Sequence, residues 1–144
     1  MTTAAIFAQG TLLKIGDGAG SETFTTVAES MTIKGLSLTR ATVDVTSHDS
    51  TGGFREYIGG LADGGEVSFD INYIPSNSTH NNTTGALSKL VNNTRTNFKL
   101  VFPDSGTTTW SFGGFVSKFE PEEAIDRQIK ASITIKVSGK PTLV

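Results

Sequence analysis

The 144-residue sequence contains no cysteine, which excludes a disulfide framework and any thiolate metal site. It has no apolar run near the roughly 18 residues that a membrane-spanning helix needs. Residues 1–10 have no basic segment ahead of their few apolar side chains, so we expect no secretion signal there. The length fits one domain, and we predict a single unit over residues 1–144.

Charge and strong helix formers are also scarce. Charged residues make up 18% of the chain and the formal net charge is −2, which argues against a basic, general nucleic-acid-binding face. The 16 glycines, with abundant Thr and Ser and few Leu and Ala, favour strands and turns over helices. The composition therefore indicates a mainly β protein.

Alternation of apolar and polar residues predicts strands with one buried face. In the clearest case Val67, Phe69, Ile71 and Tyr73 share a face, and over residues 36–47 Val43 and Val45 do the same. The other alternating segments are 10–15, 97–102, 108–119 and 128–138 (with Ile129, Ala131, Ile133, Ile135 and Val137 inward), and 24–33 is a less regular candidate. The pattern predicts an all-β fold, a β-sandwich or flattened barrel of seven or eight strands.

One segment has a helical period instead. Leu87, Leu90 and Val91 recur at helical spacing and predict a short helix over about 84–93, with a threonine N-cap and an asparagine pair at its end. Because about ten residues rarely form a stable helix alone, this helix must dock on the sheets. Within 108–119, Gly113-Gly114 breaks the alternation and predicts a bulge or a close backbone approach.

The segment 47–65 is unusual because no periodicity survives in it and six glycines interrupt it. Structureless loops longer than about 12–15 residues are uncommon in compact domains, and most are functional or disordered. Two interpretations stay open: the loop orders against a partner, or its apolar side chains cover one end of the sandwich. The residues concerned are His48, Asp49, Phe54, Arg55, Tyr57, Ile58 and Leu61.

Catalytic patterns are poorly represented. The pair Gly139-Lys140 is followed by Pro141, which excludes a phosphate-binding P-loop. The two histidines, His48 and His80, fall in predicted loops and are too few for a zinc site without further ligands. A cluster of carboxylates could serve a small hydrolase, but a solvated acidic loop is the simpler interpretation: Glu120, Glu122, Glu123 and Asp126. We therefore predict no catalytic, cofactor-binding or metal-binding residues and no enzyme activity.

The order of these elements resembles the major tail tube protein family of long-tailed, lambda-like bacteriophages. The likeness covers about residues 10–142. Three elements of the first half carry it: a short opening strand, a long loop that ends in Asp63-Gly-Gly-Glu-Val-Ser-Phe69, and one short helix. Three segments of the second half add to it: the run Phe98-Lys-Leu-Val-Phe-Pro-Asp-Ser-Gly106, the aromatic segment Trp110–Ser117, and the final strand with its tail, Ile133-Thr-Ile-Lys-Val-Ser-Gly-Lys-Pro141.

This resemblance implies a structural virion protein whose β-sandwich subunits close into hexameric rings. The rings would stack into the tail tube through the assembly loop 47–65 and an N-terminal arm, residues 1–9. DNA would pass through the lumen without specific binding. The implied partners are further copies of the chain and the tail terminator, tape measure and baseplate proteins. The subunit would assemble in the host bacterial cytoplasm, reside in the virion tail, and need no cofactor.

A tube that conducts DNA should not bind phosphates, so we expect a polar, neutral to acidic lining. The outward faces of two strands that we expect to be neighbours fit this: Thr42, Asp44 and Thr46 on one, and Ser68, Asp70 and Asn72 on the other. An ordinary solvated sheet face is the alternative. Because Lys130 and Lys136 share the polar face of the last strand, either that strand lies elsewhere or its lysines pair with carboxylates such as Asp70.

A β-sandwich carbohydrate-binding module is the alternative function. Trp110, Tyr57 and Tyr73, with many Asn and Thr side chains, are residue types that suit sugar recognition. Trp110 and Tyr73, however, occupy strand positions that fit a core better than an exposed platform.

Overall fold

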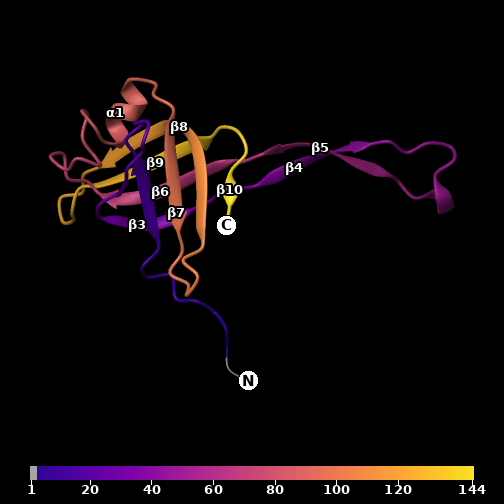
Figure 1. Cartoon of the computed structure of the whole chain (residues 1–144), viewed down its shortest axis with the longest axis horizontal. Coiled ribbons are helices and arrows are strands. Elements are labelled where there is room, and N and C mark those ends of the chain that lie inside the picture. Colours follow the sequence, from indigo (N-terminus) through magenta and orange to yellow (C-terminus); the bar gives the residue numbers. More distant parts are fainter. Residues whose placement is uncertain (1–2) are drawn as a thin grey trace.

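The computed structural model describes residues 3–144, and strands dominate it (Figure 1). The strands are β1 (Leu12–Gly16), β2 (Phe24–Thr26), β3 (Ser30–Lys34), β4 (Thr39–Asp44), β5 (Tyr57–Asp63), β6 (Glu66–Asn72), β7 (Thr96–Val101), β8 (Thr109–Glu122), β9 (Lys130–Val137) and β10 (Thr142–Leu143). A 3-10 turn, η1 (Thr51–Gly53), and one helix, α1 (Ala86–Val91), complete the set. The predicted all-β class with one short helix is confirmed.

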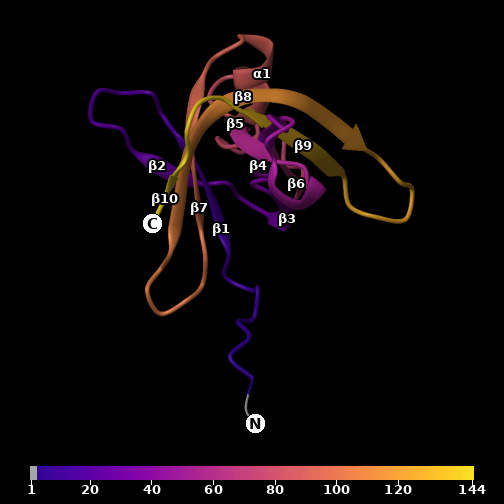
Figure 2. The same cartoon turned by 90° about the vertical axis from the view of Figure 1, so that its right-hand side faces the viewer.

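Eight of the strands form one curled antiparallel sheet. Its order is β2-β1-β7-β8-β9-β6-β3, and β10 pairs with β8. Strand β8 turns the sheet, because its first part pairs with β7 as far as Gly114 and the rest pairs with β9 from Gly114 onward. Figure 2 shows β8 arching over the molecule. The curled sheet folds back on itself as a flattened barrel around its core.

The core lies between the two halves of this sheet. Val67, Phe69 and Ile71 of β6 are buried, as their alternation predicted, and they stand opposite Ile135, Ile133 and Ala131 of β9. Leu13, Phe98, Leu100 and Phe112 fill the other half, where the rings of Phe98 and Phe112 stack 5.6 Å apart. Fully burying such side chains contributes roughly 1.5–3 kcal/mol each. Ile129, by contrast, precedes β9 and is exposed, so its predicted inward position is wrong.

The double glycine of β8 allows the close backbone approach that the sequence predicted. A Cβ atom at Gly114 would collide with the carbonyl oxygen of Lys136 on β9. The register shift in this ladder lies farther along, between Val116 and Lys118. The bulge is therefore displaced from the glycines, while the glycines themselves let β8 cross from one half of the sheet to the other.

The helix and one strand differ in detail from expectation. Gly85 is the N-cap of α1 and makes no side-chain cap bond; the Oδ1 of Asn81 instead accepts the N–H groups of Thr83, Thr84 and Gly85. The threonine N-cap is therefore wrong, and Val91 is exposed rather than docked. The candidate strand 24–33 is split into β2 and β3, which lie at opposite ends of the strand order; between them Glu29 has a positive φ of 55°.

Strands β4 and β5 form a separate antiparallel ladder, which we call the arm (residues 39–63). Figure 1 shows it projecting far from the body as a continuation of β3 and β6. The prediction of a structureless loop over 47–65 is wrong for residues 57–63, which are strand. Gly59 and Gly60 hid the alternation because they have no side chain to mark a face.

At the root of the arm, Gly64-Gly65 joins β5 to β6. Gly65 has a φ of +70°, and a Cβ atom there would collide with the backbone of Ser37. The Oδ1 of Asp63 accepts the N–H of Gly65 at 2.8 Å, and Lys136 Nζ lies 3.3 Å from the same carboxylate. The Gly65 hydrogen bond, and then Lys136, hold the pKa of Asp63 below its ordinary value.

We expect Gly65→Ala to lower the free energy of unfolding by about 2 kcal/mol or more, because it adds a steric collision to an unfavourable φ. Gly18→Ala is the matched control, since Gly18 also has a positive φ (+78°) but nothing lies within 4 Å of its Cβ position. Urea denaturation of both variants measures the difference. Equal losses in the two variants would contradict the predicted collision at the root.

Candidate assembly surfaces

The arm carries apolar side chains that the described residues leave uncovered. Val43 pairs with Ile58 across the ladder, and the two are 49% and 56% exposed. Val45 is also exposed, so the buried face expected over residues 36–47 is wrong for the isolated chain. The physical reason is that a two-stranded arm has no second layer to pack against. Apolar side chains that alternate along a strand and stay exposed to solvent are typical of a surface that binds another molecule.

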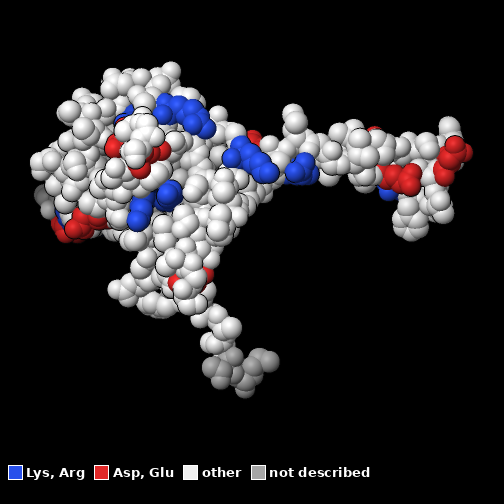
Figure 3. Space-filling view, viewed as in Figure 1, with Lys and Arg blue, Asp and Glu red and all other residues white. Residues whose placement is uncertain are grey.

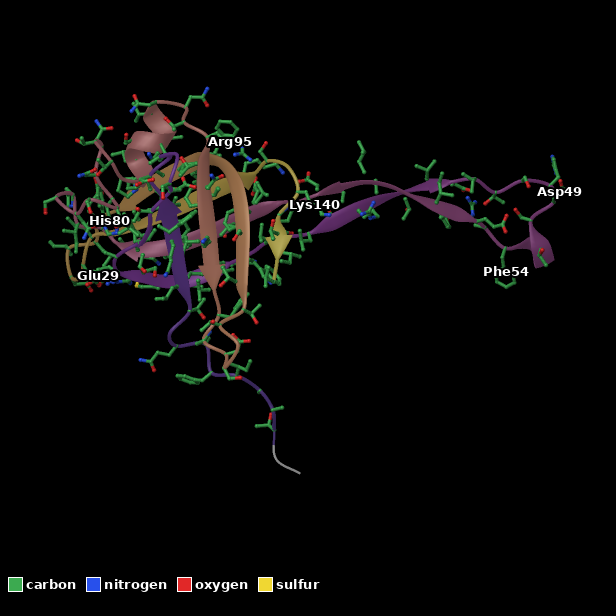
Figure 4. The ribbon with its side chains drawn as sticks, in the orientation of Figure 1. Glu29, Asp49, Phe54, His80, Arg95 and Lys140 are labelled. Atoms are coloured by element: carbon green, nitrogen blue, oxygen red, sulfur yellow. The ribbon has the colours of Figure 1, made fainter. Side chains whose placement is uncertain are left out.

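The tip of the arm, residues 44–57, contains the 3-10 turn η1 and an exposed aromatic ring. Figure 4 shows Asp49 and Phe54 at its far end. Arg55 Nη1 lies 2.9 Å from Asp44 Oδ2, and the Ser50 hydroxyl donates to Glu56 Oε2 at 2.6 Å. Hydrogen bonds from Thr46, followed by that from Arg55, lower the pKa of Asp44.

The structure places all the predicted ring-stacking residues on the arm, but it spreads them along its length. His48, Asp49, Phe54 and Arg55 lie at the tip, Tyr57 and Ile58 begin β5, and Leu61 lies near the root. All are exposed, with Leu61 the most exposed at 89%. These side chains extend away from the body, so the interpretation that they cover one end of the sandwich is wrong.

The two candidate lumen triplets do not form one face. Thr42 and Asp44 lie on β4, with Thr46 just beyond it, and β4 pairs with β5. Ser68, Asp70 and Asn72 lie on β6, which is flanked by β3 and β9. Asp44 stands opposite Tyr57 in the arm. At the rise per residue of a β-strand, the chain from Tyr57 to Asp70 spans up to roughly 40 Å. The expectation of adjacent polar faces is therefore wrong, because the strand carrying the first triplet leaves the body.

The polar face of β6 is half-buried, and its carboxylate is paired. Its residues stand opposite Thr134, Ser132 and Lys130 of β9. Asp70 accepts a hydrogen bond from the Ser132 hydroxyl at 2.8 Å and lies 3.5 Å from Lys130 Nζ. Lys136 pairs with Asp63. Of the two alternatives left open for the lysines of the last strand, pairing with carboxylates is the one observed.

A groove at the root of the arm was missed by the sequence analysis. It has a volume of about 760 Å³, and its lining includes Leu38, Arg40, Leu61, Lys140 and Leu143. Segments around residues 38–40, 60–64 and 139–143 meet there only in the folded chain. No sequence periodicity links them, so only the tertiary structure reveals this groove.

The histidines and carboxylates have structural explanations. His80 is fully buried: its Nδ1 accepts the N–H of Ile74 at 3.2 Å, so its Nε2 donates to the carbonyl of Ala28 at 2.7 Å. Glu120 is exposed and pairs with Lys118 at 2.8 Å, which lowers its pKa, whereas a general acid needs a raised one. Within residues 3–144 no group of three or more His, Asp or Glu side chains is arranged to hold a metal ion.

The aromatic residues weighed for sugar binding do not share a surface. Trp110 packs edge-on against Phe102, and Tyr73 packs edge-on against Phe119, both against the core. Tyr57 lies apart from them on the arm. Of the helices that the structure describes, none is long and apolar enough to cross a membrane.

Solved structures of tail components share this fold. The tail of an empty GTA particle, refined with C6 symmetry, aligns with a TM-score of 0.76 at 21% identity over 97% of this chain and 99% of that one. The anti-feeding prophage baseplate gives a TM-score of 0.69 at 8% identity, covering 100% and 97% of the two chains. The SPP1 tail tube gives 0.66 at 12% identity, covering 96% and 78%.

At these identities the structural likeness shows a common fold. A comparison with curated protein sequences finds no match. The model of one family, described as lambda phage tail tube protein, matches residues 9–144. Because this match spans nearly the whole chain and confirms the resemblance found in the sequence, the chain belongs to the lambda phage tail tube protein family.

Proposed function

We propose that this protein polymerises with copies of itself into hexameric rings, which stack to form the tube of a virion tail through which DNA is ejected. The uncovered apolar face of the arm is the observation that carries this proposal. Support also comes from the C6 symmetry of the solved GTA tail that shares the fold. The subunit acts as a structural component of the tube wall, without catalysis and without a cofactor.

Ring closure would use the edges of the curled sheet. Strands β2 and β3 end the strand order, and each pairs with a neighbour in this sheet on one side only. Exposed strand edges are prone to pair with other chains, and a closed ring of subunits removes them. Lateral pairing between a β2 edge and the β3 edge of the next copy would thus give both the ring and a continuous inner wall.

Ring stacking would use the arm and the N-terminal segment. An isolated two-stranded hairpin is at best marginally stable in water, so a neighbouring subunit would stabilise the arm. In the N-terminal arm, residues 1–9, the first two residues lie outside the described range. Ile6 and Phe7 of this segment are 63% and 79% exposed and offer a second contact.

The remaining partners follow from the position of a tube in a tail. A tail terminator and a baseplate would cap the two ends, and a tape measure protein would occupy the growing lumen. Assembly would take place in the host bacterial cytoplasm. The β6 face formed by Ser68, Asp70 and Asn72 is our candidate lumen lining, because Lys130, its neighbour on β9, is already paired with Asp70 and so attracts passing phosphates less.

We expect the arm amides to exchange rapidly with solvent in the isolated subunit and slowly in the assembled tube. The physical reason is that the β4–β5 ladder gains a cover only on assembly. Hydrogen exchange on both states, read by mass spectrometry, measures this, with β6 and β9 peptides as the internal control. Strong and equal protection of the arm in both states would contradict an assembly role.

Removal of the tip should abolish stacking while preserving the fold. Residues 45–56 can be replaced by Asn-Gly, since Asp44 and Tyr57 are register partners that a two-residue turn can join. The loss of the Phe54 anchor alone should cost about 2 kcal/mol or more per contact. Electron microscopy should show no long tubes, and the urea midpoint of the body should be unchanged. Long tubes from this variant would contradict the role of the tip.

Charge reversal on the β6 face should impair DNA ejection. Asp70→Lys places an unpaired cation beside Lys130, and six copies per ring would retain the passing phosphates. Particles with this variant should eject DNA slowly, with the defect relieved at high salt. Glu123→Lys, the same charge change in the exposed turn after β8, is the control. Normal ejection from Asp70→Lys particles at low salt would show that this face lies outside the lumen.

A further inference from the structure

Charge is divided between the two ends of the arm. Figure 3 shows acidic side chains gathered at the far end and basic side chains where the arm leaves the body. The tip carries three carboxylates and one arginine: Asp44, Asp49, Glu56 and Arg55. The groove at the root is lined by Arg40 and Lys140. One end of the arm is therefore acidic and the other basic.

Among the described residues, Asp49 is the tip carboxylate with neither an ion pair nor a side-chain hydrogen bond. Arg55 pairs with Asp44, and Glu56 accepts the hydroxyl of Ser50. Among residues 3–144, no cationic group lies within ion-pair distance of Asp49. The exposed ring of Phe54 lies on the same turn. The tip thus presents an apolar anchor beside a free negative charge.

At the root, the groove offers the complementary surface. Arg40 donates to the carbonyl of Gly60 at 2.8 Å, which fixes its guanidinium across the ladder. No carboxylate in the described part of the chain lies within ion-pair distance of Arg40 or Lys140; Asp63 of the lining is paired with Lys136. Leu38, Leu61 and Leu143 supply exposed apolar surface in the same groove. The groove thus combines free cations with an apolar floor.

The tip cannot fill the groove of its own molecule. The paired ladder extends from Thr39–Asp63 to Asp44–Tyr57, a rise of roughly 17–20 Å. A hairpin with this ladder cannot fold back on its root without breaking it. Any tip that contacts this groove therefore belongs to another copy. A contact between two different, complementary surfaces is head-to-tail. Copies joined by such contacts form an open-ended stack, unless the rotation from one copy to the next closes them into a ring.

We propose that the groove at the root of the arm receives the arm tip of a second copy from the adjacent ring. Phe54 packs on the apolar floor, and Asp49 pairs with Lys140, with Arg40 beside it. This inference rests on the proposed function, in that it names the acceptor for the stacking arm. Each ring then presents six tips on one side and six grooves on the other, which sets a single polarity along the tube.

A charge exchange tests the pairing. Lys140→Glu places an acid against an acidic tip, and Asp49→Lys places a cation against a basic groove. Each should raise the subunit concentration needed for tube formation by roughly tenfold or more, since juxtaposed like charges disfavour association. Combined in one chain, the two changes restore opposite charges and should return that concentration to near the original value. The single defects should also weaken at high salt.

Controls separate this inference from the proposed function. Glu123→Lys and Arg127→Glu reverse charges of the same two signs in the turn after β8, away from the arm, and should leave assembly unchanged. If tip removal abolishes tubes while Lys140→Glu assembles normally, the groove is not the acceptor although the arm still stacks the rings. Failure of the combined variant to recover would likewise overturn the pairing. If tip removal leaves tubes intact, the proposed function of the arm itself fails.

A covalent readout is independent of assembly strength. A carbodiimide joins a carboxylate to an amine only when the two are in contact. Treatment of intact tubes should yield a cross-linked peptide containing Asp49 and Lys140, and the same treatment of dilute subunits should not. Recovery of Asp49 joined only to other lysines would overturn the proposed acceptor.

Discussion

The structure depends on the way β8 is shared between two halves of one sheet. It pairs with β7 as far as Gly114 and with β9 beyond it, and the missing side chain at Gly114 lets the backbone of Lys136 come close. This crossing folds the two halves of the sheet over the core of Val67, Ile71 and their partners on β9. It also leaves β3 and β6 at one end of the strand order, from which the arm continues.

The arm has the chemistry of an interface and too little structure to stand alone. Its Val43–Ile58 pair is exposed because a hairpin provides one layer, whereas a stable sheet needs a second layer or further strands. The close approach of Gly65 to Ser37 and the contacts of the Asp63 carboxylate hold the root to the body. An arm attached in this way, with an uncovered face, suits an element whose second layer comes from a neighbouring subunit.

The β6 face illustrates a different solution, in which charge is compensated within the subunit. Lys130 is held by Asp70, and Lys136 by Asp63, so the lysines of β9 are not free cations. Lys and Arg side chains bind DNA by neutralising phosphates, which releases counterions from the DNA, so paired lysines contribute less to such binding than free ones. Arg40 and Lys140, which have no ion pair among the described residues, lie at the root of the arm, where an acidic protein surface is a suitable partner.

Much of the body was determined by the sequence itself, because alternation over segments such as 66–74 and 128–138 is a local property of strands with one covered face. The same logic located the apolar residues of the arm but misread residues 57–63, where Gly59 and Gly60 remove the signal. Only the tertiary structure decided that Thr42 and Asp44 leave the body while Ser68 and Asp70 remain in it. It alone brought Arg40, Leu61 and Lys140 into one groove, because contacts between distant segments depend on how the sheet curls and leave no periodic trace in the chain.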